Sequence, residues 1–403
     1  MLAFSRNPCG AFAVALPTEP LVRDRSFAAP AAWAFVLLVP LAFLLVGLVL
    51  RFLAFRAAMP DAPITDFAEA LCRWDCGWYV RIAEEGYDPF PVPERVAAGK
   101  WAFFPLYPGL VGLARLVLPF PTMVTATLVS LAGAYAAAVA AWPLTQGNRR
   151  AFTLYAAFIL AGPFSVYFTT FMTETMFTLL TIGVFLALRQ SSYLLAGVLA
   201  ALLSATRIVG VFIVFAIVLA MFLEHRRRGG TVAGFIPELL RRPFWLLAIV
   251  ISPLGAFAYM AFLDGLLGDA LAFQHVQRAW GRVVGNPLFY LTRSLTSFPE
   301  SGFLPTTPQQ QGLAVLFGLA MTGVLAWKRR LPEAVFSFLC ILVPLCAGTI
   351  SFIRFMAGLA PVCLMAVTLL SARFWLFAAT LLVLLVGGYF GALGWLTGYL
   401  SLV

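Results

Sequence analysis

An aspartate lies among aromatic residues in the stretch CRWDCGWYVRIAEEGYD, where Asp75 follows Trp74 and precedes Trp78 and Tyr79. A carboxylate among aromatic side chains loses hydration. This raises its pKa toward the range of a general base, unless a nearby arginine offsets the effect. The alternative is that Asp75 is the N-cap of a helix and the aromatic residues lie at a membrane interface.

Three further charged residues flank or interrupt apolar stretches: Glu174 in FMTETMF, Arg207 in SATRIVG and Arg354 in SFIRF. Guanidinium groups suit bidentate binding of phosphate, which gives both arginines a chemical use. The alternatives are a glutamate in the first turn of a helix and arginines that snorkel to the membrane interface.

The stretch GDALAFQHVQRAW begins at Gly268 and contains Asp269, Gln274, His275 and Gln277. Amide, imidazole and indole groups on one short helix suit the hydroxyls and the apolar face of a sugar, although His275 alone fits a structural role equally well. The two histidines of the chain are far apart and give no zinc spacing. The sequence has neither a glycine-rich phosphate loop nor a serine nucleophile elbow. We therefore expect neither a metal nor a cofactor.

The composition places these residues in a membrane protein. Of the 403 residues, 62% are hydrophobic and 11% are charged, whereas soluble domains are about 25% charged. A folded surface in water needs more polar residues than this chain has. The composition therefore excludes a soluble enzyme and a nucleic-acid-binding protein, and it indicates membrane lipids as the main surroundings.

Apolar stretches long enough to be helices predict an all-α polytopic membrane protein with about eleven transmembrane helices. The expected spans are 31–50, 122–144, 151–168, 174–188, 193–206, 208–223, 244–263, 312–327, 333–350, 355–372 and 375–398. Arginine-rich segments such as Arg226–Arg228 mark the cytoplasmic side. We expect a cytoplasmic tail at 1–30 and a single integral membrane domain at 31–403. The stretch 101–120 contains three prolines, so we expect it to be re-entrant or interfacial.

This topology predicts two long loops outside the cytoplasm, at 54–100 and 264–311. In the first loop, apolar residues recur at helical spacing around Ile64 and around Trp78, which predicts two amphipathic helices at the membrane surface. Cys72 and Cys76 could form a disulfide there, although two cysteines on one helix would have poor geometry. The candidate residues all map to this outer side, which suggests one cavity that opens outward.

These residues also carry a family resemblance. The pattern Trp74-Asp75, Trp78-Tyr79, Ile82-Ala83 and Gly86-Tyr87, followed by Phe103-Phe104-Pro105-Leu106-Tyr107-Pro108, resembles the signature of the PIG-V-type mannosyltransferases. Weaker matches follow in order at Thr173-Glu174, Thr206-Arg207, Gly268-Asp269 and Ser351 with Arg354-Phe355. Two positions depart from the family pattern, with Ile208 in place of proline and Phe355 in place of tyrosine.

The resemblance implies a bacterial GT-C glycosyltransferase, with a GT-C-type helix bundle and an active site on the extracytoplasmic side of the cytoplasmic membrane. It implies inverting transfer of a sugar, mannose in this family, from a polyprenyl-phosphate donor to a hydroxyl of a lipid or glycan acceptor. Asp75 is at the position of the family's catalytic aspartate. The expected substrate-binding residues are Trp74, Trp78, Tyr79, Glu174, Arg207, Asp269, Gln274, His275, Gln277 and Arg354.

Two other functions remain open on the sequence. A transporter or flippase of a lipid-linked saccharide would be expected to have polar residues near mid-membrane and broken helices in repeated halves. A non-catalytic membrane subunit would have no reason to expose an aspartate among aromatic residues. The acceptor is not specified by any motif.

Overall fold

The computed structural model describes residues 30–90, 98–297 and 307–398. Within these ranges all regular elements are helices, so the fold is all-α as predicted. The tail predicted at 1–30 lies almost wholly outside the described residues. So do parts of both predicted outer loops, at 91–97 and 298–306.

The chain forms nineteen α-helices in the described ranges. In order they are α1 (Pro30–Ala58), α2 (Phe67–Ala70), α3 (Cys76–Glu85), α4 (Leu106–Arg115), α5 (Thr122–Ala140), α6 (Arg149–Ala161), α7 (Glu174–Arg189), α8 (Tyr193–Ser204), α9 (Ile213–Arg227), α10 (Phe235–Arg241), α11 (Pro243–Ile251), α12 (Leu254–Leu267), α13 (Ala272–His275), α14 (Pro287–Leu295), α15 (Thr307–Trp327), α16 (Leu331–Leu345), α17 (Phe352–Gly358), α18 (Ala360–Leu370) and α19 (Phe374–Leu396). Short 3-10 helices that border the site include η3 (Lys100–Ala102), η5 (Ser165–Phe168), η6 (Ile208–Phe212) and η7 (Val276–Trp280).

Five apolar helical segments are long enough to cross a hydrocarbon core, which makes the chain an integral membrane protein. They are Trp33–Ala58, Thr122–Thr145, Ile208–Arg227, Thr307–Trp327 and Phe374–Leu396. The number rises to seven if two bent helix pairs each count as one span. The expected number of eleven is not confirmed, because several of the predicted spans form helices of only 10–17 residues.

Both bent pairs replace a span that we expected to be continuous. Helices α11 and α12 meet at 43°, and α17 and α18 meet at 76°. Proline lacks a backbone donor and clashes with the preceding turn, and Pro253 and Pro361 lie at the two bends. The second bend makes α17 a short separate helix, and this helix carries Arg354.

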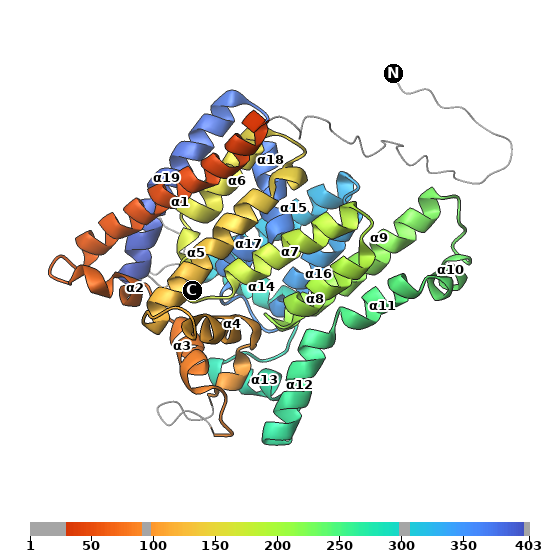
Figure 1. The fold of residues 1–403 in the computed structure, drawn as a ribbon, viewed down its shortest axis with the longest axis horizontal. Coiled ribbons are helices and arrows are strands. Elements are labelled where there is room, and N and C mark those ends of the chain that lie inside the picture. The colour runs from red at the N-terminus through yellow and green to blue at the C-terminus, as the bar shows by residue number, and fades with distance from the viewer. Residues whose placement is uncertain (1–29, 91–97, 298–306, 399–403) are drawn as a thin grey trace.

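Three short helices lie at one end of the bundle. Helices α3, α4 and α13 gather there, opposite the N-terminal end of α1 (Figure 1). Helix α4 has ten residues and is about 15 Å long, so the stretch 101–120 does not cross the bilayer within it. The first predicted loop helix is present as η2 (Ile64–Asp66) and α2, and the second as α3. Since α1 continues to Ala58 and α12 to Leu267, both loops begin several residues later than expected.

Close helix packing fixes the segment that leads to α7. A Cβ added at Gly47 of α1 or at Gly388 of α19 would lie 1.9 Å from a carbonyl oxygen at the end of α6. Glycine therefore permits the backbones of these helices to approach, as is common in membrane helix packing. Arg51 is buried beside them and donates to the carbonyl of Leu160 at 3.0 Å and to Oγ of Ser165 at 2.7 Å.

Candidate active site

Asp75 is joined directly to Arg354, a residue 279 positions further along the chain. Nη1 of Arg354 donates to Oδ2 of Asp75 at 2.6 Å. Asp75 also occupies the N-cap position of α3, but its side chain makes no capping hydrogen bond. The carboxylate therefore serves the ion pair and not the helix end.

A second carboxylate extends this pair into a network. Glu174, the first residue of α7, is completely buried and forms an ion pair with Arg207. Its Oε1 also lies 3.2 Å from Nε of Arg354. Nε of Arg207 donates to Oγ1 of Thr173 at 2.6 Å. The result is an alternating series of charges, Asp75–Arg354–Glu174–Arg207, which compensates the cost of burying each group.

The network borders a cavity of about 380 Å³ whose lining combines charged and polar residues with apolar ones. The polar lining residues are Asp75, Tyr79, Thr206, Arg207, Gln274, Gln277, Arg282 and Arg354. The other lining residues are apolar, and they include Ile208 of η6 and Val343 and Pro344 of α16. Such a cavity can hold a charged or hydroxylated head group together with part of an apolar chain.

Arg282, between η7 and α14, is a cavity residue that the sequence analysis missed. Its Nη1 donates to Oε1 of Gln277 at 3.5 Å. No described residue places a carboxylate within 4.0 Å of it, unlike Arg207 and Arg354. Burial, followed by the charge of Arg354, lowers the pKa of Arg282. A signal was available: Arg282 is an arginine in a loop assigned to the outer side, where arginine is uncommon.

The electrostatic setting of Asp75 differs from the simplest expectation. Burial alone would raise the pKa of this carboxyl, but the charge and hydrogen bond of Arg354 outweigh burial, and Arg282 and Arg207 add to the effect. The pKa of Asp75 therefore lies below its ordinary value. Arg354 is thus a nearby arginine that offsets the effect of lost hydration, and Asp75 is ionised at neutral pH.

Aromatic side chains cover the cavity beside Asp75. Trp78 is buried and stacks on Phe103 with ring centroids 5.5 Å apart, and Trp280 packs edge-on against both rings. Tyr79 and Trp280 line the cavity itself. Burial raises the pKa of Tyr79 to about 12, so its hydroxyl stays protonated at neutral pH.

Five of the predicted substrate-binding residues lie apart from the cavity lining: Trp74, Trp78, Glu174, Asp269 and His275. His275 and Asp269 are joined at 2.7 Å, and their side chains are well exposed. The hydrogen bond from His275 lowers the pKa of Asp269. Trp74 is 41% exposed. Gln274 and Gln277 do line the cavity. Thus the short α13–η7 segment presents its amides to the cavity, but not His275.

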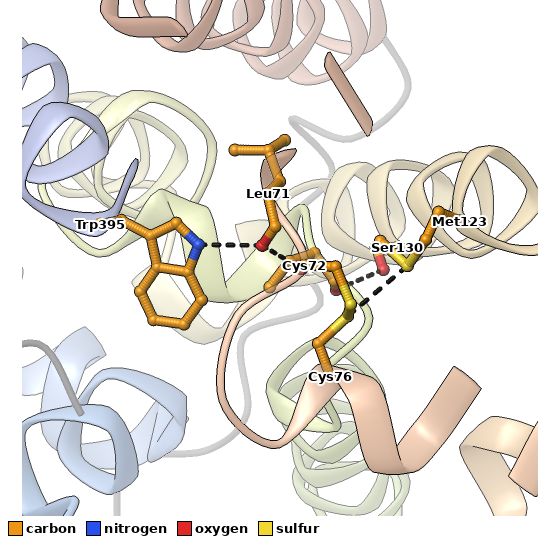
Figure 2. Close-up of a disulfide and its surroundings, with 7 residues drawn as sticks. Leu71, Cys72, Cys76, Met123, Ser130 and Trp395 are labelled. Carbon is orange, nitrogen blue, oxygen red and sulfur yellow. Dashed lines mark hydrogen bonds between the residues drawn. A yellow bond between two sulfur atoms is a disulfide. The ribbon is translucent and has the colours of Figure 1, made fainter. Parts of the chain in front are cut away.

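The loop that carries Asp75 is closed by a disulfide and contacts two other parts of the structure (Figure 2). Cys72 and Cys76 form a disulfide, and they do not share a helix because α3 begins at Cys76. The carbonyl of Leu71 accepts hydrogen bonds from Nε1 of Trp395 and from Oγ1 of Thr170, both at 2.9 Å. The loop thereby contacts α19 and the segment that precedes α7.

A second cavity, of about 480 Å³, lies beyond α17 between α6, α15, α18 and α19. Met356 belongs to the lining of both cavities. None of the described residues that line the second cavity is charged. It therefore offers no charged side chain among its described lining residues.

The first cavity combines four chemical capacities. Its arginines can bind an anion, its ionised carboxylate can accept a proton, its amides and aromatic rings suit a sugar, and its walls suit an alkyl chain. Among the described residues, three guanidinium groups accompany the two carboxylates, which leaves one positive charge in excess. Among the residues that the structure describes, no group of three or more His, Cys, Asp or Glu side chains could hold a metal ion.

No protein-family model and no curated protein matches the chain. Three solved structures of the oligosaccharyltransferase of Archaeoglobus fulgidus are similar to it. The form tethered with an acceptor peptide containing the NVT sequon has a TM-score of 0.45 at 15% identity and covers 88% of this chain. The apo form and the complex with Zn and sulfate both have a TM-score of 0.44 at 14% identity. The aligned part is 53–56% of those chains, so this chain spans about half their length.

Proposed function

We propose that this protein is an inverting glycosyltransferase that moves a sugar from a polyprenyl-phosphate donor to a hydroxyl of a lipid or glycan acceptor. One observation carries the proposal. An ionised carboxylate, Asp75, is hydrogen-bonded to Arg354 at the edge of a cavity that has an excess positive charge and apolar walls. Mannose is the sugar implied by the sequence resemblance, and we adopt it as the first donor to test.

The donor phosphate has a suitable site at Arg282 and Arg354, with Arg207 behind them. A sugar phosphodiester carries a single negative charge, which would neutralise the one excess positive charge of Arg207, Arg282 and Arg354 over Asp75 and Glu174. Arg282 is ready for this role because it has no carboxylate partner among the described residues. The polyprenyl chain would lie along the apolar residues of η6 and α16.

The proposed reaction is a single displacement at the anomeric carbon. Asp75 takes the proton of the acceptor hydroxyl as the oxygen forms its bond to that carbon. The bond between the carbon and the phosphate oxygen breaks, and its electron pair leaves with the polyprenyl phosphate. Arg282 and Arg354 stabilise the charge that gathers on the phosphate. Attack from the side opposite the leaving group inverts the anomeric configuration.

The disulfide supports an active site outside the cytoplasm. Disulfides persist in oxidising compartments and are rare in the cytosol, and the bond between Cys72 and Cys76 encloses Asp75. The arginine-rich segments, counted as cytoplasmic, give the same side for this loop. We therefore place the reaction at the outer face of a bacterial cytoplasmic membrane, where a lipid-phosphate sugar can be presented.

A transporter or flippase of a lipid-linked saccharide is the second candidate. It is favoured by the two bent helix pairs, because broken helices are a common feature of transporter binding sites. The ionised Asp75 at the edge of the cavity favours the transferase, since moving a lipid-linked saccharide across a membrane requires no base.

The test is transfer from a labelled polyprenyl-phosphate sugar by the purified protein. Removing the base with Asp75→Asn should lower kcat by about 10²- to 10⁴-fold, the usual contribution of general-base catalysis. Asp61→Asn is the matched control, because Asp61 is exposed in the same loop and should retain full activity. Equal rates for Asp75→Asn and the native protein would refute the assignment of the base.

A further inference from the structure

The five residues from Cys72 to Cys76 form a small covalent ring that contains Asp75. The two cysteine Cα atoms are 5.3 Å apart, and the disulfide closes the ring. Cys76 is completely buried, and its sulfur lies 3.5 Å from the sulfur of Met123 in α5 (Figure 2). The helix start at Cys76 is therefore held against the bundle.

The other side of the ring is held as well. Leu71 is completely buried, and its carbonyl accepts the hydrogen bonds from Trp395 and Thr170. Nη2 of Arg73 donates to the carbonyl of Leu396 at 2.6 Å. Both cysteines thus adjoin fixed points, whereas Trp74 and Asp75 lie between them.

The backbone within the ring is in an unfavourable conformation. Trp74 has φ of 58°, in the left-handed region that bulky residues rarely adopt. Trp74 is 41% exposed, so the indole is only partly packed against the protein. Residues in such conformations persist only where the surrounding structure holds them there, and they gather at functional sites. The residue that follows Trp74 is the proposed base.

We propose that the Cys72–Cys76 disulfide is a positioning element of the active site, which holds Trp74 in its left-handed conformation and thereby keeps Asp75 against Arg354. This inference rests on the proposed function for its catalytic consequence, but not for its structural one. Reduction by a dithiol would convert the disulfide to two thiols, and the dithiol would become a disulfide. Trp74 could then relax to negative φ, and the direction of the Asp75 side chain would change.

The experiment compares oxidised protein, protein reduced with dithiothreitol, and the double variant Cys72→Ser/Cys76→Ser. Cys346→Ser is the control, because Cys346 is a partly buried free cysteine outside the ring. Hydrogen exchange of a peptide that covers residues 72–79 reports the loop, and a peptide from α7 reports the bundle. Kinetics report kcat, KM for the donor and the pH profile.

Loss of the ring should raise exchange in the 72–79 peptide and leave α7 unchanged. We expect kcat to fall about 10- to 100-fold, as small displacements of reacting groups commonly do. KM for the donor should not rise, because Arg207, Arg282 and Arg354 lie outside the ring and Asp75 would no longer compete with the donor phosphate for Arg354.

The pH profile distinguishes positioning from general destabilisation. The charged and titratable groups that face Asp75 are Arg354, Arg282, Arg207 and Tyr79, with Glu174 behind Arg354. Once Asp75 leaves Arg354, its pKa rises, so the acid limb of kcat/KM should move to higher pH.

Two results would overturn the inference: unchanged exchange in the 72–79 peptide after reduction, or increased exchange with an unchanged kcat and pH profile. If the oxidised native protein shows no transfer at all, the proposed function fails. In that case the exchange measurement alone decides whether the disulfide positions the loop.

Discussion

Arg354 must exchange partners during the proposed reaction. In the structure it donates to Asp75, and an aspartate stabilised in this way is a weak base. A donor phosphate would compete for Arg354 and would place a negative charge near Asp75. Both changes raise the pKa of Asp75, because a like charge disfavours the ionised form. Donor binding would therefore make Asp75 a stronger base.

We expect substitution of Arg282 to weaken binding of the donor. Removing a hydrogen bond to a charged group costs about 1.5–3 kcal/mol, so Arg282→Gln should raise KM for the donor by about 10- to 150-fold. Arg278→Gln removes an exposed arginine from the same segment and should leave KM unchanged. The measurement is steady-state transfer over a range of donor concentrations. Equal KM values for the two variants would exclude Arg282 from the phosphate site.

The pH dependence follows from the lowered pKa of Asp75 in the free protein. Its ionised form is fully present at neutral pH and is lost only as the pH falls through that lowered pKa. The acid limb of kcat/KM, which reports the free enzyme, should therefore lie below the ordinary aspartate value of about 3.9. The limb of kcat, which reports the complex, should lie at higher pH. An acid limb of kcat/KM above the ordinary value would contradict the ion pair.

Part of this site was predictable from the sequence. Asp75, Arg207 and Arg354 were found because charges at the ends of apolar stretches are unusual. Arg282 was missed because it lies in a loop whose path no periodicity determines. His275 and Asp269 were expected at the site, but they pair with each other, since the side of a short helix that faces a cavity depends on tertiary packing.

Among the elements, α7 and α17 are joined by charge as well as by packing. Glu174 at the start of α7 meets Arg354 of α17, and Ser351 before α17 has φ of 71°. A left-handed residue lies at the start of α17 just as one precedes α3. Both members of the Asp75–Arg354 pair are thus positioned by an unusual backbone conformation at the start of a short helix.

Removing Arg354 should destabilise the fold. Arg354→Met leaves Asp75 without its ion-pair partner and Glu174 with one arginine in place of two, and breaking a buried pair costs about 3–5 kcal/mol. Arg228→Met is the control, because it removes an arginine that is 55% exposed from its pair with Glu224, and a pair at the surface is worth about 0–1 kcal/mol. Thermal unfolding in detergent measures both. Similar unfolding temperatures for the two variants would show that the buried network contributes little.

The helical class and the loop helices could be predicted from apolar periodicity, but the number of spans could not. Hydropathy alone reads α11 with α12, and α17 with α18, as continuous segments, because the bends involve only one or two residues. Short helices such as α7 and α8 are as apolar as true spans, yet are too short to cross alone. A disulfide between Cys72 and Cys76 was also uncertain from the sequence, because the start of α3 decides whether the two cysteines share a helix.

At the scale of the whole molecule, the proposed reaction requires that α3, α13 and η7, which border the cavity, lie at the outer surface of the membrane. Ala279 and Arg227 are exposed residues, the first in η7 and the second at the end of α9. We expect Ala279→Cys to react with a membrane-impermeant thiol reagent added to intact cells, and Arg227→Cys to react only after permeabilisation. The unsubstituted protein gives the background from its own cysteines. The opposite pattern would place the cavity on the cytoplasmic side.

The most direct test of the central claim uses purified protein in lipid vesicles with a polyprenyl-phosphate sugar and a hydroxyl acceptor. We expect one polyprenyl phosphate to be released for each sugar transferred, and the product to have an inverted anomeric configuration by NMR. Movement of intact donor across the bilayer, with no bond broken and no product formed, would contradict the transferase and establish the transporter.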